Sequence, residues 1–236
     1  MKIKSLYKLG TMKKMIGIIG GMGPQATIQL MQNILNLTKS KIDQNHLPLC
    51  IWNDPRVPHR TDAILSNDTQ EVCNYLVNSA KKLEDANCQF IIMPCNTAHF
   101  WADNIQKSIN IPFVNMIDET LNVINKKNHK SIALLATKGT IYSNIYQKSA
   151  DKYNIKVNYP SDKDIEKLMN IINSIKANDY DNSWTSYQLY SIINNTKSDC
   201  AILGCTELSI ISLKHPFIFD PLRILTYKTI QLWNTL

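Results

Sequence analysis

The stretch Phe90-Ile-Ile-Met-Pro-Cys-Asn-Thr97 joins a short apolar run to a turn that carries a cysteine, and Ala201-Ile-Leu-Gly-Cys-Thr-Glu207 repeats this pattern. A short apolar run bounded by turn residues is consistent with a buried strand of a parallel sheet. The Asn and Thr residues that follow the cysteines are types that commonly begin a helix. We therefore predict that Cys95 and Cys205 each lie between the carboxyl end of a strand and the start of a helix.

Two earlier loops are related in the same way. Strand-like Ile16–Ile19 runs into the loop Gly20-Gly-Met-Gly-Pro24, and Ile132–Leu135 runs into Ala136-Thr-Lys-Gly-Thr140. This order indicates two related halves, each with an early loop and a cysteine turn. Ligands of open α/β sheets bind beyond the carboxyl ends of the strands. Two such halves facing each other would enclose a cleft with one cysteine on each wall.

The rest of the chain alternates apolar runs with segments of helical spacing, which predicts βαβ units around parallel sheets. Two helical faces are Ala26, Leu30, Ile34 and Leu37, and Val72, Leu76, Ala80 and Leu83. The apolar runs are Met15–Gly20, Leu47–Trp52, Phe90–Met93, Pro112–Met116, Ser131–Ala136, Ile155–Tyr159, Cys200–Gly204 and Phe217–Phe219.

We expect an α/β fold of two pseudo-symmetric domains, each a mainly parallel sheet flanked by helices, with the active site in the cleft between them. The first domain is expected over residues 15–117 and the second over 118–221. A C-terminal helix over 222–236 is expected to pack back on the first domain, and residues 1–14 form an extension.

Composition narrows the function classes. The hydrophobic fraction of 44% and the charged fraction of 19% are those of an ordinary globular protein. No apolar run approaches the roughly 20 residues that cross a bilayer, and the N-terminus lacks the apolar core of a secretory signal. The formal charge of +7 comes from scattered lysines. We therefore expect a cytoplasmic protein that binds neither membrane nor nucleic acid, and whose positive potential favours a small anionic substrate.

The chain has six cysteines and no Cys-x-x-Cys pair, which removes the usual zinc-ribbon and thioredoxin-like spacings. We interpret Cys50, Cys73, Cys88 and Cys200 as core or surface thiols. Cys95 and Cys205 differ because they occupy matching places in the two halves. A helix N-terminus lowers the pKa of a thiol from about 8.5. A thiolate on one face of a substrate could then remove the α-proton, and a thiol on the opposite face could give a proton back to the α-carbon.

At these positions the sequence resembles the aspartate/glutamate/hydantoin racemase superfamily, and most closely its aspartate racemase branch. The resemblance is carried by Ile16-Gly-Ile-Ile-Gly-Gly-Met-Gly-Pro24, Met93-Pro-Cys-Asn-Thr-Ala-His99 and Leu203-Gly-Cys-Thr-Glu207. Weaker matches are Asn53-Asp-Pro-Arg-Val-Pro-His-Arg-Thr61, Leu135-Ala-Thr-Lys-Gly-Thr140 and Asp220-Pro221. The resemblance implies an isomerase that needs no pyridoxal phosphate, other cofactor or metal, that forms a homodimer, and that transfers one proton between Cys95 and Cys205.

The resemblance also implies roles for the residues around the thiols. Arg60 and Lys176 match positions associated with an acidic substrate, and Glu207 would hold the substrate ammonium or orient Cys205. The residues expected to bind the α-carboxylate and ammonium are Met22, Asn96, Thr97, Thr137 and Thr206.

Three positions leave alternatives open. The family often has Asp where this chain has His59, and a neutral residue where it has Arg56. Arg56 would either favour a dicarboxylate through a bidentate contact or face solvent. His99 would either support a thiolate electrostatically or act as a capping or packing residue.

Other functions remain to be separated from racemisation of aspartate. Gly21-x-Gly23-x-x-Ala26 fits a loose dinucleotide pattern, although Pro24 interrupts it. A non-catalytic amino-acid-binding protein would keep the cleft without the chemistry. Within the superfamily, a glutamate or hydantoin racemase or a one-cysteine decarboxylase is the alternative. The two cysteines disfavour the decarboxylase, and the basic loop disfavours an uncharged hydantoin.

Overall fold

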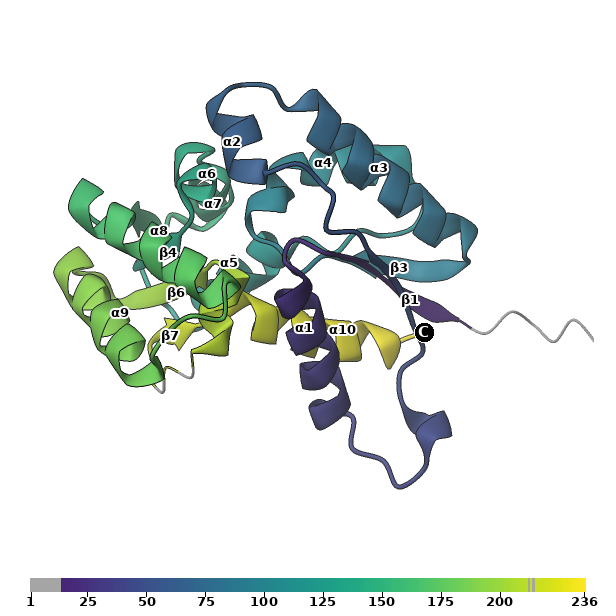
Figure 1. The fold of residues 1–236 in the computed structure, drawn as a ribbon. Helices are drawn as coiled ribbons and strands as arrows, with labels where there is room; N and C mark the ends of the chain where they lie inside the picture. The colour runs from purple at the N-terminus through teal and green to yellow at the C-terminus, as the bar shows by residue number, and fades with distance from the viewer. Residues whose placement is uncertain (1–13, 212, 214) are drawn as a thin grey trace, which may run out of the picture.

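The computed structural model describes residues 14–211, 213 and 215–236 and consists of two halves (Figure 1). Short 3-10 helices are labelled η. The first half contains β1 (Met15–Gly20), α1 (Pro24–Leu37), η1 (Asp43–Asn45), β2 (Leu49–Asn53), α2 (Arg60–Leu65), α3 (Gln70–Asp85), β3 (Cys88–Ile92), η2 (Thr97–Trp101) and α4 (Ala102–Ser108).

The second half follows α5 (Met116–Lys126) and ends before α10 (Pro221–Trp233). It contains β4 (Ser131–Ala136), α6 (Lys138–Tyr142), α7 (Ile145–Ala150), η3 (Asp151–Tyr153), β5 (Lys156–Asn158), α8 (Asp162–Lys176), α9 (Asn182–Thr196), β6 (Cys200–Gly204), η4 (Thr206–Ile210) and β7 (Ile218–Phe219).

The two sheets have the same internal order. The first is β2-β1-β3 and the second is β5-β4-β6-β7, and every strand pair is parallel. In both, the strand that leads into the early loop is central, and the strand that leads into the cysteine turn is its neighbour. The predicted fold class, two pseudo-symmetric α/β units built on parallel sheets, is therefore confirmed.

Apolar packing explains why these strands form. The residues of β1 and β4 from the second position onward are buried, as expected for central strands covered by helices on both faces. One core cluster joins β1 and α1 to α10 through Ile16, Leu30 and Leu225. The C-terminal helix thus packs beside α1 against the first sheet (Figure 1).

Two details differ from the sequence-based expectation. The run Pro112–Met116 is not a strand, because it makes only an isolated bridge from Phe113 to Ile91 before α5 begins at Met116. Leu37, placed by its spacing on the buried face of α1, is 42% exposed because the helix ends there. The predicted extension over residues 1–14 lies outside the described residues, except for the exposed Lys14.

Candidate active site

Both cysteines of interest lie at the ends of buried strands and face one cavity. Cys95 follows β3 after a two-residue step, and Cys205 follows β6 directly. Their exposed fractions are 6% and 5%, and both line the same cavity between the halves. The expected helix after each cysteine is a short 3-10 helix, η2 or η4, and neither has a side-chain N-cap.

All ten predicted site residues line this cavity, which brings together segments from six parts of the chain. His59 and Thr61 line it as well. The predicted members are Met22, Arg60, Cys95, Asn96, Thr97, Thr137, Lys176, Cys205, Thr206 and Glu207. The cavity volume is about 20 Å³, room for roughly one water molecule. The described conformation is therefore closed, and an amino acid can enter only if the halves or a loop move apart.

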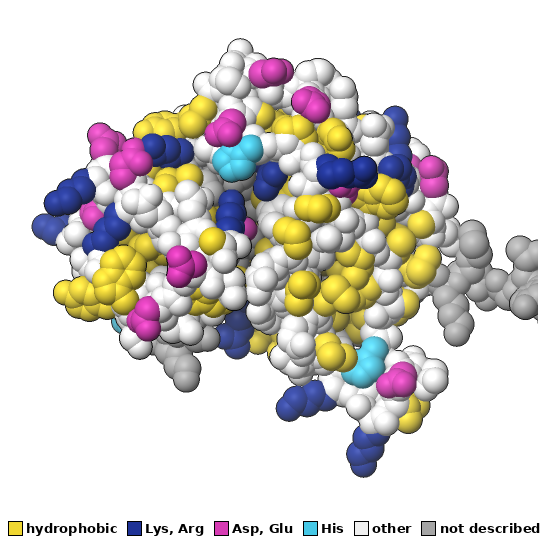
Figure 2. All heavy atoms as spheres, in the orientation of Figure 1, with side chains coloured by type: hydrophobic (Ala, Val, Ile, Leu, Met, Phe, Trp, Pro, Cys, Tyr) yellow, Lys and Arg dark blue, Asp and Glu magenta, His cyan; other side chains and the backbone are white. Residues whose placement is uncertain are grey.

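The mouth of the cavity is basic. Lys176 at the end of α8 and His59 before α2 are exposed, and Arg60 is half-buried. Figure 2 shows Lys or Arg side chains and a His gathered along the groove between the two halves. Such a rim raises the local concentration of small anions.

Burial, rather than a helix N-terminus, controls the acidity of the two thiols. Desolvation raises the pKa of Cys95, although the positive charge of Arg60 and an N–H donated by Ala98 pull it back. Desolvation and the negative charge of Glu207 raise the pKa of Cys205 well above its usual value. The expected lowering of the thiol pKa values is thus wrong, because both are raised, and Cys95 is the more readily ionised of the two.

Glu207 contacts the second thiol directly. The Sγ of Cys205 donates to Oε2 of Glu207 across 2.8 Å, and both side chains are buried. The carboxylate is therefore placed to hold the Cys205 proton and to fix the direction of its S–H bond. Its other oxygen lies close to Gly23, where an added Cβ would be 3.4 Å from Oε1.

Three threonine hydroxyls close the cavity between the halves. Oγ1 of Thr97 lies 2.9 Å from Oγ1 of both Thr137 and Thr140, which are 3.1 Å from each other. Thr137 also caps α6 by accepting from the N–H of Thr140. These three hydroxyls are therefore hydrogen-bond partners of one another.

Two buried donors in the cavity have no partner within the described residues. They are Nδ2 of Asn96 and Nε of Arg60. The Arg60 guanidinium is otherwise anchored, since Nη1 donates to the carbonyl oxygens of Val57 and Pro58 at 3.1 Å. Leaving buried donors unpaired is unfavourable, so an acceptor on a bound ligand would be favourable at either atom.

His99 is a structural residue of the first cysteine turn. Its Nδ1 lies 2.7 Å from the carbonyl oxygen of Cys95, and its Nε2 accepts from the N–H of Met116 at 3.1 Å. This arrangement requires the neutral ring with its proton on Nδ1. Desolvation lowers the pKa of His99 from 6.5 to about 4. Of the two roles considered from the sequence, packing and positioning is therefore the one observed.

The loop Gly20–Pro24 packs directly against the backbone of another loop of the protein. Gly21 has a φ of 95°, and a Cβ there would lie 2.4 Å from the backbone of Asp54. The backbone that approaches this glycine belongs to the Asn53–Thr61 loop, which disfavours the dinucleotide interpretation. Asp54 is held by Arg56 through a 2.8 Å ion pair, so Arg56 points to its own loop.

Two residues of the site region were not predicted from the sequence. Thr140 completes the hydroxyl cluster, and the loop Leu135–Thr140 was its only signal. Tyr146 from α7 donates to Oδ1 of Asn96 at 2.6 Å, and no sequence signal pointed to it.

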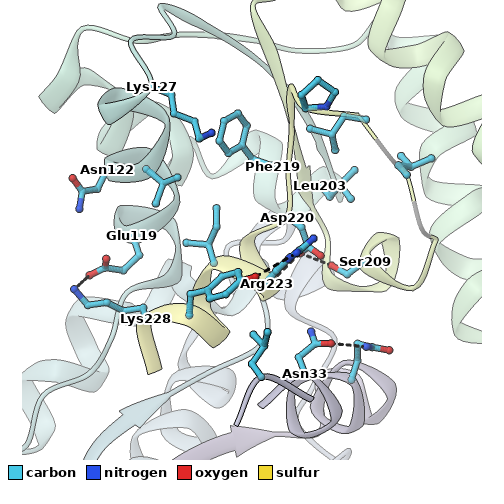
Figure 3. A pocket seen from close by; sticks show the side chains of 18 of the residues that line it. Asn33, Glu119, Asn122, Lys127, Leu203, Ser209, Phe219, Asp220, Arg223 and Lys228 are labelled. Atoms are coloured by element: carbon cyan, nitrogen blue, oxygen red, sulfur yellow. Dashed lines mark hydrogen bonds and ion pairs between the residues drawn. The ribbon is translucent and has the colours of Figure 1, made fainter. Parts of the chain in front are cut away.

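A second cavity of about 1120 Å³ lies between α1, α5 and α10, away from the thiols (Figure 3). Both carboxylate side chains that line it have partners within the protein. Glu119 pairs with Lys228 at 3.0 Å, and Asp220 accepts from Ser209 at 2.7 Å while capping α10. Neither Cys95 nor Cys205 lines this groove.

Two further properties concern the described part of the chain as a whole. It contains no group of three or more His, Cys, Asp or Glu side chains arranged to hold a metal ion. Within the same residues, no helix has both the length and the apolarity needed to span a bilayer.

Comparison with known proteins places this geometry in a family. The structure of aspartate racemase from Picrophilus torridus is 32% identical, with a TM-score of 0.81 over 94% of this chain and 95% of that one. The structure of an aspartate racemase homologue from Pyrococcus horikoshii is 27% identical, with a TM-score of 0.75 over 94% of this chain and 100% of that one.

A curated relative, the broad specificity amino-acid racemase RacX from Bacillus subtilis, is 33% identical over 140 residues. That match spans 57% of this chain and 59% of RacX, less than two thirds of the relative's length. The family model described as Asp/Glu/hydantoin racemase matches residues 19–225. This match covers most of the chain, including both cysteine turns, and the chain therefore belongs to the Asp/Glu/hydantoin racemase family.

Proposed function

We propose that this protein is a cofactor-independent amino-acid racemase that interconverts L- and D-aspartate. The observation that carries the proposal is one closed cavity lined by two buried thiols and by two buried donors without acceptors. The donors of Asn96 and Arg60 fit the carboxylates of an acidic amino acid. The thiols of Cys95 and Cys205 fit the two opposite faces of its α-carbon.

The reaction is a transfer of one proton. The thiolate of Cys95 takes the α-proton from one face, and the thiol of Cys205 gives its proton to the opposite face. Cys95 is then a thiol and Cys205 a thiolate, the state from which the reverse reaction begins. Glu207 holds the S–H of Cys205 and orients it. Donors at the α-carboxylate stabilise the negative charge that develops when the proton leaves.

The basic rim supports an acidic substrate. Arg60 and Lys176 line the cavity, and we assign to them the side-chain carboxylate. Thr97, Thr137 and Thr206 would exchange their present partners for the substrate's α-carboxylate and ammonium. The likeness to a broad specificity racemase makes a wider substrate range the second candidate.

Substitution of the thiols tests the mechanism. Cys95→Ala and Cys205→Ala should each abolish racemisation from either enantiomer, measured by chiral chromatography without added cofactor. Cys88→Ala and Cys200→Ala are matched controls, because these buried cysteines begin β3 and β6, the strands that lead to Cys95 and Cys205, but do not line the cavity. Substantial turnover by either active-site variant would rule out transfer between two thiols.

Deuterium incorporation separates an enzyme from a binding protein. In D₂O the wild-type protein should place deuterium at the α-carbon of aspartate, detected as a mass increase. Aspartate that binds but gains no deuterium would identify a non-catalytic binding protein.

We further propose a homodimer in the cytoplasm. Helix α1 presents Ile28, Met31 and Leu35 on one exposed face, with exposed fractions of 62%, 39% and 48%. An apolar stripe of this kind is a candidate subunit contact, and light scattering of wild type and Met31→Lys tests it. The mechanism needs both thiols reduced, which is the state that the cytoplasm maintains.

A further inference from the structure

The side chain of Asn96 is held from the opposite half of the molecule. Asn96 follows Cys95 in the first half, and the hydroxyl of Tyr146 in α7 of the second half donates to its Oδ1 at 2.6 Å. Asparagine at the start of a helix usually caps the helix with this oxygen. Asn96 precedes η2 but makes no capping hydrogen bond. Its amide is therefore committed to Tyr146 and the cavity.

The phenol leaves the amide one favourable orientation. Tyr146 is fully buried, and its hydroxyl makes one hydrogen bond among the described residues, the bond to Asn96. A flipped amide would present its NH₂ group to the hydroxyl and leave the phenol hydrogen buried without an acceptor, which is costly. Burial also raises the pKa of Tyr146 well above its usual value, so the hydroxyl stays protonated and remains a donor.

The orientation of the amide decides which group Asn96 offers to a ligand. With Oδ1 taken by Tyr146, the NH₂ group is left as a donor, and Nδ2 of Asn96 is buried with no partner. Asn96 lines the cavity that contains both thiols. Asn96 therefore offers a ligand in the cavity a hydrogen-bond donor, its NH₂ group, and not an acceptor.

We propose that Tyr146 is a positioning residue for substrate binding, which fixes the Asn96 amide so that Nδ2 donates to the α-carboxylate of the bound amino acid. The inference rests on the proposed function of the cavity. It also links binding to closure, because Tyr146 and Asn96 belong to different halves and form their bond only when the halves meet.

The test is Tyr146→Phe, which keeps the ring and removes the hydroxyl. The expected result is a rise of about tenfold in KM for aspartate, equivalent to about 1.4 kcal/mol, with kcat changed by less than about threefold. A loss of this kind is the signature of weakened substrate binding. Tyr159→Phe is the control, since among the described residues the one hydrogen bond of that hydroxyl is a 3.5 Å contact with Asn144, which does not line the cavity. It should leave both constants unchanged.

A double-mutant cycle distinguishes positioning from general loosening of the fold. In an Asn96→Ala background there is no amide left to orient, so adding Tyr146→Phe should change KM by less than about twofold. A further tenfold rise in that background would overturn the proposal. Asn96→Asp gives an independent readout. The carboxylate accepts from Tyr146 and presents a second acceptor to the substrate, so KM should rise more than for Asn96→Ala.

Calorimetric titration with aspartate keeps the two proposals separate. Wild-type turnover with an unchanged KM and an unchanged dissociation constant in Tyr146→Phe would refute the role of Tyr146 and leave the racemase assignment standing. Binding without turnover in wild type would refute the racemase assignment. A tenfold weaker dissociation constant in Tyr146→Phe would still support the positioning role in that case. Absence of both turnover and binding in wild type would refute both.

Discussion

Replacing the buried His99 by asparagine removes an imidazole whose pKa the fold lowers from 6.5 to about 4. The asparagine amide can still donate to the carbonyl oxygen of Cys95, the partner that Nδ1 of His99 reaches at 2.7 Å. The acceptor for the N–H of Met116 is lost. The variant therefore keeps one contact at the cysteine turn and can no longer titrate.

The size of the effect follows from the pKa shift. Between pH 6.5 and about 4 the unfolded chain carries a proton on this ring and the folded protein does not. A group whose pKa is lowered in the folded state contributes stability above its unfolded pKa and loses it as the pH falls. At 1.36 kcal/mol per pKa unit, the full shift corresponds to about 3 kcal/mol. Between about pH 7 and about pH 5 the free energy of unfolding should fall by about 2 kcal/mol from this group.

Urea unfolding at the two pH values measures this term. Wild type should lose about 2 kcal/mol more on acidification than His99→Asn. Leu76→Ala is the control, because it creates a cavity in the core of the first half without touching His99. That variant should be less stable at both pH values but show the wild-type difference between them. Equal pH dependence in wild type and His99→Asn would show that the ring is not buried in its neutral form.

Three further predictions concern the cavity. Arg60→Ala and Lys176→Ala should each lower kcat/KM for aspartate by at least about tenfold and much less for a neutral amino acid, and equal losses would reject their assignment. Gly139→Ala should raise KM, because its methyl group would lie 2.8 Å from Cα of Thr61 and force α6 from α2. An unchanged KM would show that these helices separate freely. Glu207→Gln should speed alkylation of Cys205 at a given pH, followed by peptide mass spectrometry. The negative charge of Glu207 raises the pKa of this thiol, and the substitution removes that charge.

The strand-end positions were predictable because they depend on local pattern. The apolar runs before Cys95 and Cys205 form β3 and β6, and the matching order of the two halves predicts that both cysteines face one cleft. The same local pattern gave a wrong prediction for the apolar run Pro112–Met116, which is not a strand. Its apolar residues are extended beside β3 and share its hydrogen bonds, but the chain turns into α5 too soon for a strand.

Properties that depend on the facing half could not be obtained from local pattern. The position of a thiol at the end of a strand indicates a favourable helix terminus, yet burial between the two halves outweighs that effect at both cysteines. Tyr146 illustrates the same limit. Nothing in the sequence of α7 distinguishes it from a core tyrosine, because its role exists only through a residue fifty positions away.

The raised thiol pKa values are compatible with the proposed proton transfer, which needs only one of the two thiols in its ionised form. Desolvation opposes a thiolate, but the ammonium of an amino acid bound between the thiols would add a positive charge there and favour the ionised form. The positive charge of Arg60 lowers the pKa of Cys95, whereas the negative charge of Glu207 raises the pKa of Cys205. One proton is therefore shared unequally, and the first thiolate to form on substrate binding should be that of Cys95.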